Sequence, residues 1–350
     1  MYEYELVASA LKLLRDCFDV QPNETVAITI DTESDKTVAN ATAKAAIILN
    51  AKPLVIEMPT ARGCGKAGDP DFAIGALVGL LSNVDVWVEY NTQWLFYSTA
   101  YDLIVAANKK LRYMVLVDCP ADLFIRNIGR TNLITLGRFI RKAADITQNA
   151  KHVRITTLAG TDIHFENMPN REFGIGDGIV LAGEVRTLPG QVGWAPKFDT
   201  INGVITFDAS IVPAVGILSN PVSVHVKNGR CVRIEGGQEA AKFEKWLNSF
   251  DDPRMFNLVH VCYGFGPNAI LSGRIIEDER IWGSTEWGFG NLGACLTIPD
   301  IPEGIAAASH CDGICLNSTV YLDGVLFLLN GEVVGPTPDV VALAEEARAE

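Results

Sequence analysis

The residues best suited to chemistry lie near the C-terminus, in the run 308–324, which has the pattern of an extended strand closed by an Asp-Gly turn. Side chains two residues apart project from one face of a strand, so His310 and Asp312 present an imidazole and a carboxylate side by side. Another histidine, His260, lies in the apolar, strand-like run 258–266. Two histidines and one carboxylate form the ligand set of non-haem Fe(II) oxygenases, although a buried histidine can equally be an ordinary core residue.

Two further carboxylates stand in unusual sequence contexts. Glu184 lies between glycine turns, away from any amphipathic helix that would present it to solvent. Glu286 lies among aromatic residues and glycines in the run 282–290. A buried carboxylate needs a partner, because burial of an unpaired charge is costly. A metal ion, a proton held by a raised pKa, or a nearby arginine such as Arg274 or Arg280 would each meet this need.

The first half of the chain alternates between strand-like and helix-like segments. The strand-like runs are 25–30, 53–57, 84–89 and 112–117, and the helix-like segments are 4–18, 36–49, 71–81, 101–111 and 137–149. This alternation predicts a parallel sheet that carries helices on its faces. We therefore expect an open, Rossmann-like α/β domain over residues 1–150.

From residue 152 the pattern changes to short β runs separated by glycine turns. Asn228-Gly229 is typical of a tight hairpin, because these residue types accept the positive φ that such turns need. One helix-like segment follows at 238–250. We expect residues 151–350 to form a mainly β (α+β) domain that carries the metal ligands. The predicted fold class is therefore α/β, with an N-terminal open parallel sheet domain and a C-terminal metal-binding domain.

The loop at 91–98 follows the third expected strand and contains Trp94 and Tyr97. Open α/β sheets bind ligands at the carboxyl ends of their strands, so these two side chains are candidate substrate contacts. A contact with another domain or subunit is the alternative. The glycine-rich run 62–68 lacks the spacing of a phosphate-binding loop, and we interpret it as a flexible connection.

The composition and charge of the chain disfavour some classes of binding partner. The chain has 350 residues, of which 48% are hydrophobic and 20% charged, and its net charge of −13 disfavours nucleic acid and anionic membranes as partners. No run is apolar and long enough to span a bilayer, and the first residues lack the basic start of a signal peptide, so we expect a cytoplasmic protein. The eight cysteines include no CxxC pair and should be free thiols. Cys311 should face away from the ligands and pack in the core.

Together these motifs resemble the aminopeptidase T-like metallopeptidase superfamily, and within it most of all the 2,5-dihydroxypyridine 5,6-dioxygenase branch. The resemblance extends over most of the chain, but its specific motifs lie in residues 183–324. They are His260…Gly264…Gly266-Pro267-Asn268-Ala269…Gly273…Glu277-Asp278-Glu279…Gly283, then His310-Cys311-Asp312-Gly313 and Thr319-Val320-Tyr321-Leu322-Asp323-Gly324.

The two branches imply different metal sites. The dioxygenase branch implies a single Fe(II) held by His260, His310 and Asp312. In the peptidase branch the position of His260 is typically Glu and that of Glu286 typically His, and a pair of metal ions also uses a Glu in the Gly-Glu-Val context of Glu184. This sequence combines the dioxygenase-like His260 with both glutamates.

Three functions follow as hypotheses. The first is an Fe(II)-dependent, extradiol-type ring-cleaving dioxygenase that uses O2 on a hydroxylated, dihydroxypyridine-like N-heteroaromatic compound, with Glu184 or Glu286 as general acid/base and Trp94 and Tyr97 against the ring. The second is a hydrolase of a peptide, amide or cyclic amide with one or two Zn, Mn or Co ions. The third is a non-catalytic metal-binding or ligand-binding protein. The resemblance also implies a homo-oligomer, and it implies a histidine in the 91–98 loop that this chain lacks.

Overall fold

A computed structural model describes residues 2–292 and 298–349. The chain forms two compact units, one made of residues 1–131 and 178–189 and the other of residues 132–177 and 190–350. The sequence suggested a single boundary near residue 150. In the structure, helix α6 (Leu133–Asn149) belongs to the second unit, and the chain later returns to the first.

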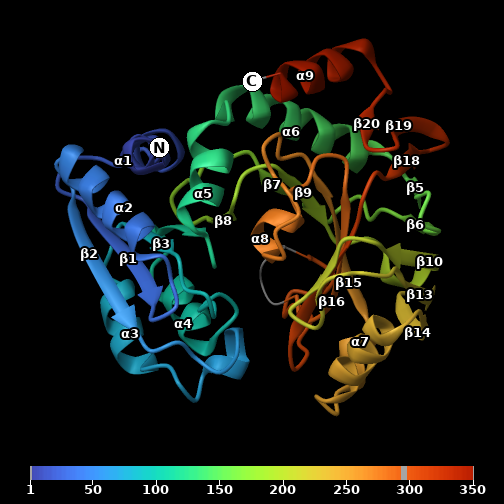
Figure 1. The fold of residues 1–350 in the computed structure, drawn as a ribbon, viewed down its shortest axis with the longest axis horizontal. Helices are drawn as coiled ribbons and strands as arrows, with labels where there is room; N and C mark the ends of the chain where they lie inside the picture. The colour runs from blue at the N-terminus through green and yellow to red at the C-terminus, as the bar shows by residue number, and fades with distance from the viewer. Residues whose placement is uncertain (1, 293–297, 350) are drawn as a thin grey trace. The chain divides into compact units, whose positions relative to one another are not determined.

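The first unit is built on a five-stranded parallel sheet with the order β2-β1-β3-β4-β8 (blue to green in Figure 1). Its strands are β1 (Thr25–Asp31), β2 (Lys52–Met58), β3 (Val86–Glu89), β4 (Arg112–Val115) and β8 (Val185–Thr187). Its helices are α1 (Tyr2–Lys12), α2 (Lys36–Ile48), α3 (Ile74–Leu81), α4 (Thr99–Ala107) and α5 (Ala121–Phe124). Since α2 and α3 connect strands in opposite directions across the sheet, right-handed crossovers place them on opposite faces. The predicted open parallel α/β sheet is confirmed, with β8 as an unpredicted edge strand.

The second unit contains two antiparallel sheets, which agrees with the mainly β domain expected from its sequence. The eight-stranded sheet has the order β14-β13-β10-β6-β5-β18-β19-β20, and the seven-stranded sheet has the order β12-β11-β17-β16-β15-β9-β7. Large side chains from both sheets, among them Phe165, Phe207, Trp194 and Trp287, share one buried core. The predicted hairpin at Asn228-Gly229 joins β13 to β14, and both residues have positive φ.

The bounds of the elements in this unit are as follows. The strands of the eight-stranded sheet are β5 (His152–Thr156), β6 (Asp162–Glu166), β10 (Asn202–Phe207), β13 (Val222–Lys227), β14 (Arg230–Glu235), β18 (Thr319–Leu322), β19 (Val325–Leu329) and β20 (Glu332–Val333). Those of the seven-stranded sheet are β7 (Gly174–Gly176), β9 (Gln191–Trp194), β11 (Ser210–Val212), β12 (Gly216–Ile217), β15 (Leu258–Gly264), β16 (Thr285–Gly290) and β17 (His310–Cys315). The helices besides α6 are α7 (Gln238–Asn248), α8 (Ile275–Asp278) and α9 (Pro338–Arg348).

Several smaller expectations can be compared with this structure. No disulfide joins the described cysteines, and Cys311 is buried in the core as predicted. Cys295 lies outside the described residues. Among the helices in the described part of the chain, none is long and apolar enough to cross a membrane.

Two buried carboxylates in the first unit hold the loop that follows β3. Asp31, at the end of β1, accepts hydrogen bonds from the backbone N–H groups of Thr92 (2.7 Å) and Gln93 (3.0 Å). Glu89, at the end of β3, accepts one from the backbone N–H of Leu95 and one from the hydroxyl of Tyr113. Burial nevertheless raises the pKa of Glu89 to about 7, because these hydrogen bonds do not replace full hydration of the charge.

Glu89 should make the stability of the protein depend on pH. The folded protein binds this proton more tightly than the unfolded chain, whose pKa is near 4.5, so the stability it contributes is lost as pH rises to about 7. Relative to Glu89→Gln, the free energy of unfolding of the wild type should fall by on the order of 3 kcal/mol as pH rises from 4.5 to about 7. Urea unfolding at several pH values measures the difference. The exposed Glu57→Gln is the matched control, and an equal pH dependence in wild type and Glu89→Gln would contradict the prediction.

Candidate metal centre

Three neighbouring strands of the seven-stranded sheet carry the predicted ligands. Strand β16 lies between β15 and β17 and is antiparallel to both. In this register Gly288 of β16 lies opposite His260 of β15 on one side and Asp312 of β17 on the other. Residues so placed point to the same face of a sheet, and the intervening glycine leaves the space between them open.

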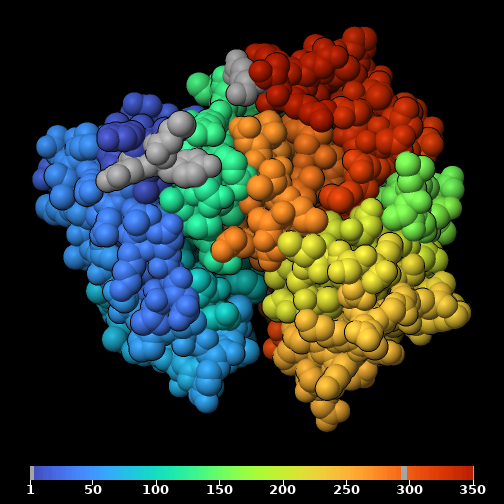
Figure 2. Space-filling view, in the orientation of Figure 1, coloured from blue at the N-terminus to red at the C-terminus, as the bar shows by residue number. Residues whose placement is uncertain are grey.

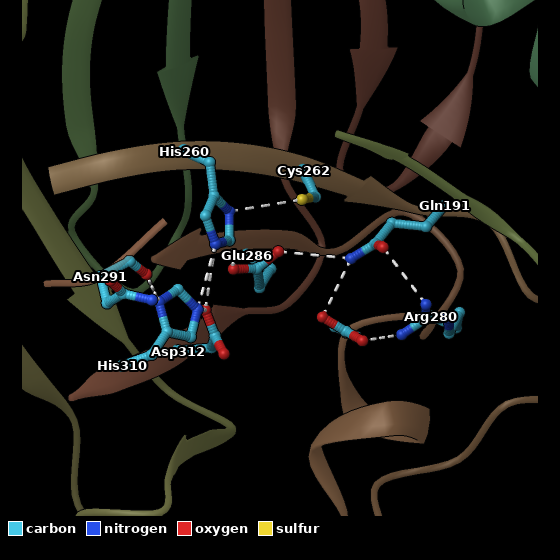
Figure 3. A network of polar contacts seen from close by, with 9 residues as sticks. Gln191, His260, Cys262, Arg280, Glu286, Asn291, His310 and Asp312 are labelled. Atoms are coloured by element: carbon cyan, nitrogen blue, oxygen red, sulfur yellow. Dashed lines mark hydrogen bonds and ion pairs between the residues drawn. The ribbon is translucent and has the colours of Figure 1, made fainter. Parts of the chain in front are cut away.

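The side chains of His260, His310 and Asp312 converge on one point (Figure 3). The Nε2 atoms of the two histidines are 3.2 Å apart, and Asp312 Oδ1 lies 2.8 Å from His310 Nε2 and 3.5 Å from His260 Nε2. Only about a tenth of each side chain is exposed. Asp312 Oδ1 is buried, and at these distances it faces the Nε2 atoms of both histidines. Two imidazole nitrogens and a carboxylate oxygen in this arrangement fit a divalent metal ion.

The Nδ1 atoms of the two histidines face different partners. His310 Nδ1 faces the backbone carbonyl oxygen of Asn291. His260 Nδ1 lies 3.3 Å from Glu286 Oε1 and 3.6 Å from Cys262 Sγ. With these contacts behind the rings, both Nε2 atoms are turned toward Asp312, which leaves them available to a metal ion.

Burial and mutual charge set the protonation states of the four ionisable groups. Burial lowers the pKa of His260 to about 4, although the charge of Asp312 acts against this. Burial also opposes ionisation of Asp312, but the charge of His310 and its hydrogen bond lower the Asp312 pKa to about 2. For His310, burial is outweighed by Asp312 and the Asn291 carbonyl, which raise its pKa. Burial, followed by the charge of Asp312, raises the pKa of Glu286 well above its ordinary value. Near neutral pH the cluster thus offers an ionised carboxylate and a neutral imidazole at His260.

Glu286 is fully buried in β16 and is linked to a charged pair through Gln191. Gln191 Nε2 donates to Glu286 Oε2 at 3.3 Å and to Glu279 Oε2 at 3.0 Å. Gln191 Oε1 in turn accepts from Nη2 of Arg280 at 3.2 Å, and Arg280 forms an ion pair with Glu279. Arg280, which the sequence suggested as a partner for the charge of Glu286, is therefore connected to Glu286 through the side-chain amide of Gln191.

The sequence interpretation did not single out several residues that shape this cluster. Gly288 is required because a Cβ at this position would overlap the imidazole of His260. The available signal was its place inside a strand, where an isolated glycine often marks a close approach. Gln191, Cys262 and Asn291 had no comparable signal, because their contacts depend on how distant segments pair.

The other predicted site residues belong to the first unit. Glu184 precedes β8, and its carboxylate accepts from Arg186 Nη2 at 2.6 Å and from the backbone N–H of Leu181 at 2.8 Å. Trp94 and Tyr97 are partly buried in the loop held by Asp31 and Glu89. The structure therefore brings together His260, Glu286, His310 and Asp312, and it places Glu184, Trp94 and Tyr97 within the parallel-sheet unit.

Comparisons with known proteins agree with the superfamily resemblance. A model of the 2,5-dihydroxypyridine 5,6-dioxygenase family matches residues 5–335. The 2,5-dihydroxypyridine 5,6-dioxygenase of Pseudomonas putida is 23% identical over 364 residues, which cover 99% of this chain and 97% of that protein.

Two solved structures share the fold. The structure of 2,5-dihydroxypyridine dioxygenase from Pseudomonas putida has a TM-score of 0.77 and 22% identity, and covers 95% of this chain and 98% of its own. AmpT from Thermus thermophilus has a TM-score of 0.70 and 12% identity, and covers 96% of this chain and 100% of its own. The fold class and the branch within the superfamily are thereby confirmed.

The geometry predicts which side chains the bound ion requires. His310→Ala and Asp312→Asn should weaken binding of a divalent ion by more than the roughly 10–100-fold that loss of an outer partner typically costs. Metal analysis after chelation and reloading, with a competing chelator to obtain the dissociation constant, measures this. His164→Ala, at an exposed strand position, is the matched control. Unchanged affinity in Asp312→Asn would contradict the assigned ligand set.

Proposed function

The chain belongs to the 2,5-dihydroxypyridine 5,6-dioxygenase family, and from this premise we propose that it opens the ring of a hydroxylated N-heteroaromatic compound with O2 in an iron-dependent reaction. The single observation that supports the proposal most directly is the convergence of His260 Nε2, His310 Nε2 and Asp312 Oδ1 at one buried point. A two-histidine, one-carboxylate set leaves coordination positions open, which is the arrangement of non-haem Fe(II) oxygenases.

We propose His260, His310 and Asp312 as the ligands of Fe(II). A bound Fe(II) would supply open coordination positions for a hydroxyl oxygen of the substrate and for O2. The protein contributes a neutral imidazole at His260 and an ionised carboxylate at Asp312, the protonation states that a cation needs. Burial of these side chains also limits access of bulk water to the ligand atoms.

Two carboxylates remain candidates for proton transfer. Burial, followed by the charge of Asp312, raises the pKa of Glu286, and its carboxyl group lies beside the proposed ligand His260. Glu184 is ion-paired with Arg186 in the first unit. Either could serve as the general acid/base of the proposed reaction.

The proposal also covers the substrate and the assembly. Trp94 and Tyr97 are proposed as contacts with a planar ring, because aromatic side chains at the carboxyl end of a parallel strand stack on such ligands. The absence of a histidine in the 91–98 loop favours a substrate related to 2,5-dihydroxypyridine over that compound itself. A homo-oligomer and a cytoplasmic location remain proposals from the resemblance and the composition.

Oxygen consumption tests the reaction. Protein purified anaerobically and loaded with Fe(II) should consume one O2 for each ring opened in a panel of hydroxypyridines, because both oxygen atoms enter the product. His260→Ala and His310→Ala should have no detectable activity, since each removes a proposed iron ligand. An oxygen electrode combined with product mass measures both. Substrate turnover in the zinc-loaded protein without O2 would contradict the dioxygenase proposal.

The ring contacts can be tested separately. Trp94→Ala should raise KM by roughly tenfold with a smaller change in kcat, because loss of ring stacking removes on the order of 1 kcal/mol of binding energy. Trp94→Phe keeps an aromatic face and should retain most of the affinity. Steady-state kinetics on the best substrate of the panel measures both variants, and equal KM values in wild type and Trp94→Ala would exclude Trp94 as a ring contact.

A further inference from the structure

We infer that Glu286 is a positioning residue, whose carboxyl oxygen Oε1 accepts a hydrogen bond from Nδ1–H of His260 and thereby presents His260 Nε2 to the metal ion. The inference rests on the proposed metal centre and assigns Glu286 a role within it. A neutral imidazole carries its proton on one nitrogen only, so a partner that holds the proton on Nδ1 leaves the lone pair of Nε2 available.

The contacts behind His260 identify the partner. Glu286 Oε1 lies 3.3 Å from His260 Nδ1, within reach of a hydrogen bond, and this buried oxygen is not engaged in any hydrogen bond within the described part of the chain. Cys262 Sγ is the other neighbour, at 3.6 Å. A thiol that donated to Nδ1 would place the histidine proton on Nε2, where it would block metal binding. When the proton is on Nδ1 the Cys262 sulfur can only accept it, and sulfur is a weak acceptor, so the Glu286 carboxyl oxygen is the stronger of the two partners.

The orientation of the Glu286 carboxyl group is set from its other side. Gln191 Nε2 donates to Oε2, which leaves Oε1 directed at the imidazole (Figure 3). Gln191 is in turn held by Glu279 and by Arg280, which is completely buried and donates to the Ile276 carbonyl oxygen at 3.0 Å. Hydrogen bonds thus connect the ion pair of Glu279 and Arg280 to the Glu286 carboxyl group, which lies behind one proposed ligand.

The two histidines differ in the group that lies behind Nδ1. Behind His310 lies a backbone carbonyl oxygen, that of Asn291, and behind His260 a side chain. Substitution of Glu286 can therefore remove the partner of one ligand and leave that of the other in place. His310 provides an internal reference for any measurement on His260.

The experiment uses the full-length protein loaded with Zn(II), which is diamagnetic and needs no turnover. The chain has five histidines, so two-dimensional ¹H–¹⁵N spectra of the imidazole groups are simple enough to assign. The wild type should show Nδ1–H signals at low field for both His260 and His310, because both protons are hydrogen-bonded and shielded from exchange. Zinc affinity is measured on the same samples with a competing chromophoric chelator.

Three variants separate positioning from packing. In Glu286→Ala the Nδ1–H signal of His260 should disappear by exchange while that of His310 remains, and zinc affinity should fall by roughly 10–100-fold. Glu286→Gln keeps the shape of the side chain and leaves no cavity of the kind that alanine leaves. It should still weaken zinc binding, because an amide has one acceptor oxygen where the carboxyl group has two. Cys262→Ala removes the other neighbour of His260 Nδ1, and it should keep the His260 signal and lower the zinc affinity less than Glu286→Ala does.

Other results would overturn the inference. Unchanged zinc affinity and an unchanged His260 signal in both Glu286 variants would make Glu286 a packing residue, and loss of a second zinc ion would make it a ligand. A wild type that binds no zinc would overturn both the metal centre and this inference. If the signals behave as expected but the iron-loaded protein consumes no O2 with any hydroxypyridine, the dioxygenase proposal fails and the positioning role stands.

Discussion

The cost of burying charge in the seven-stranded sheet governs the whole candidate site. Asp312 and Glu286 lie in adjacent strands and both are buried, so they cannot both ionise cheaply. The structure resolves this conflict by giving them different neighbours. The charges of His310 and His260 lower the pKa of Asp312 against the effect of burial, whereas burial and the charge of Asp312 raise the pKa of Glu286, which lies beside His260 Nδ1 and the Gln191 amide. The same separation leaves one full negative charge at the point where the histidine nitrogens converge.

The sheet itself supplies the precision that such a cluster needs. Ligands on adjacent antiparallel strands are positioned by backbone hydrogen bonds, which are stiffer than loop contacts. Gly288 makes the arrangement possible, because the register puts it between His260 and Asp312, where a side chain would collide with the imidazole. The convergence of His260 and Asp312 therefore depends on the absence of a side chain at Gly288.

The first unit uses buried carboxylates for another purpose. Asp31 and Glu89 end adjacent parallel strands, and both accept hydrogen bonds from backbone N–H groups of the following loop. Their role is to hold backbone, whereas Asp312 is oriented toward side-chain nitrogens. This difference explains why a buried acid in a sequence does not by itself identify a metal site. It also gives the loop that carries Trp94 a defined shape, which a ring contact would require.

Local covalent geometry let the sequence determine some features of this protein by itself. His310 and Asp312 share a face because they are two residues apart in a strand, and Asn228-Gly229 forms its hairpin because of the φ values these residues accept. The alternation of strands and helices likewise predicted the parallel sheet. Only the tertiary structure decided the meeting of His260 with His310, the contact of Glu286 with Nδ1, the bridging place of Gln191 and the return of the chain through β8. These contacts depend on the order and register of strands that are far apart in the chain. Packing of the whole core selects this order and register, and no local sequence pattern encodes them.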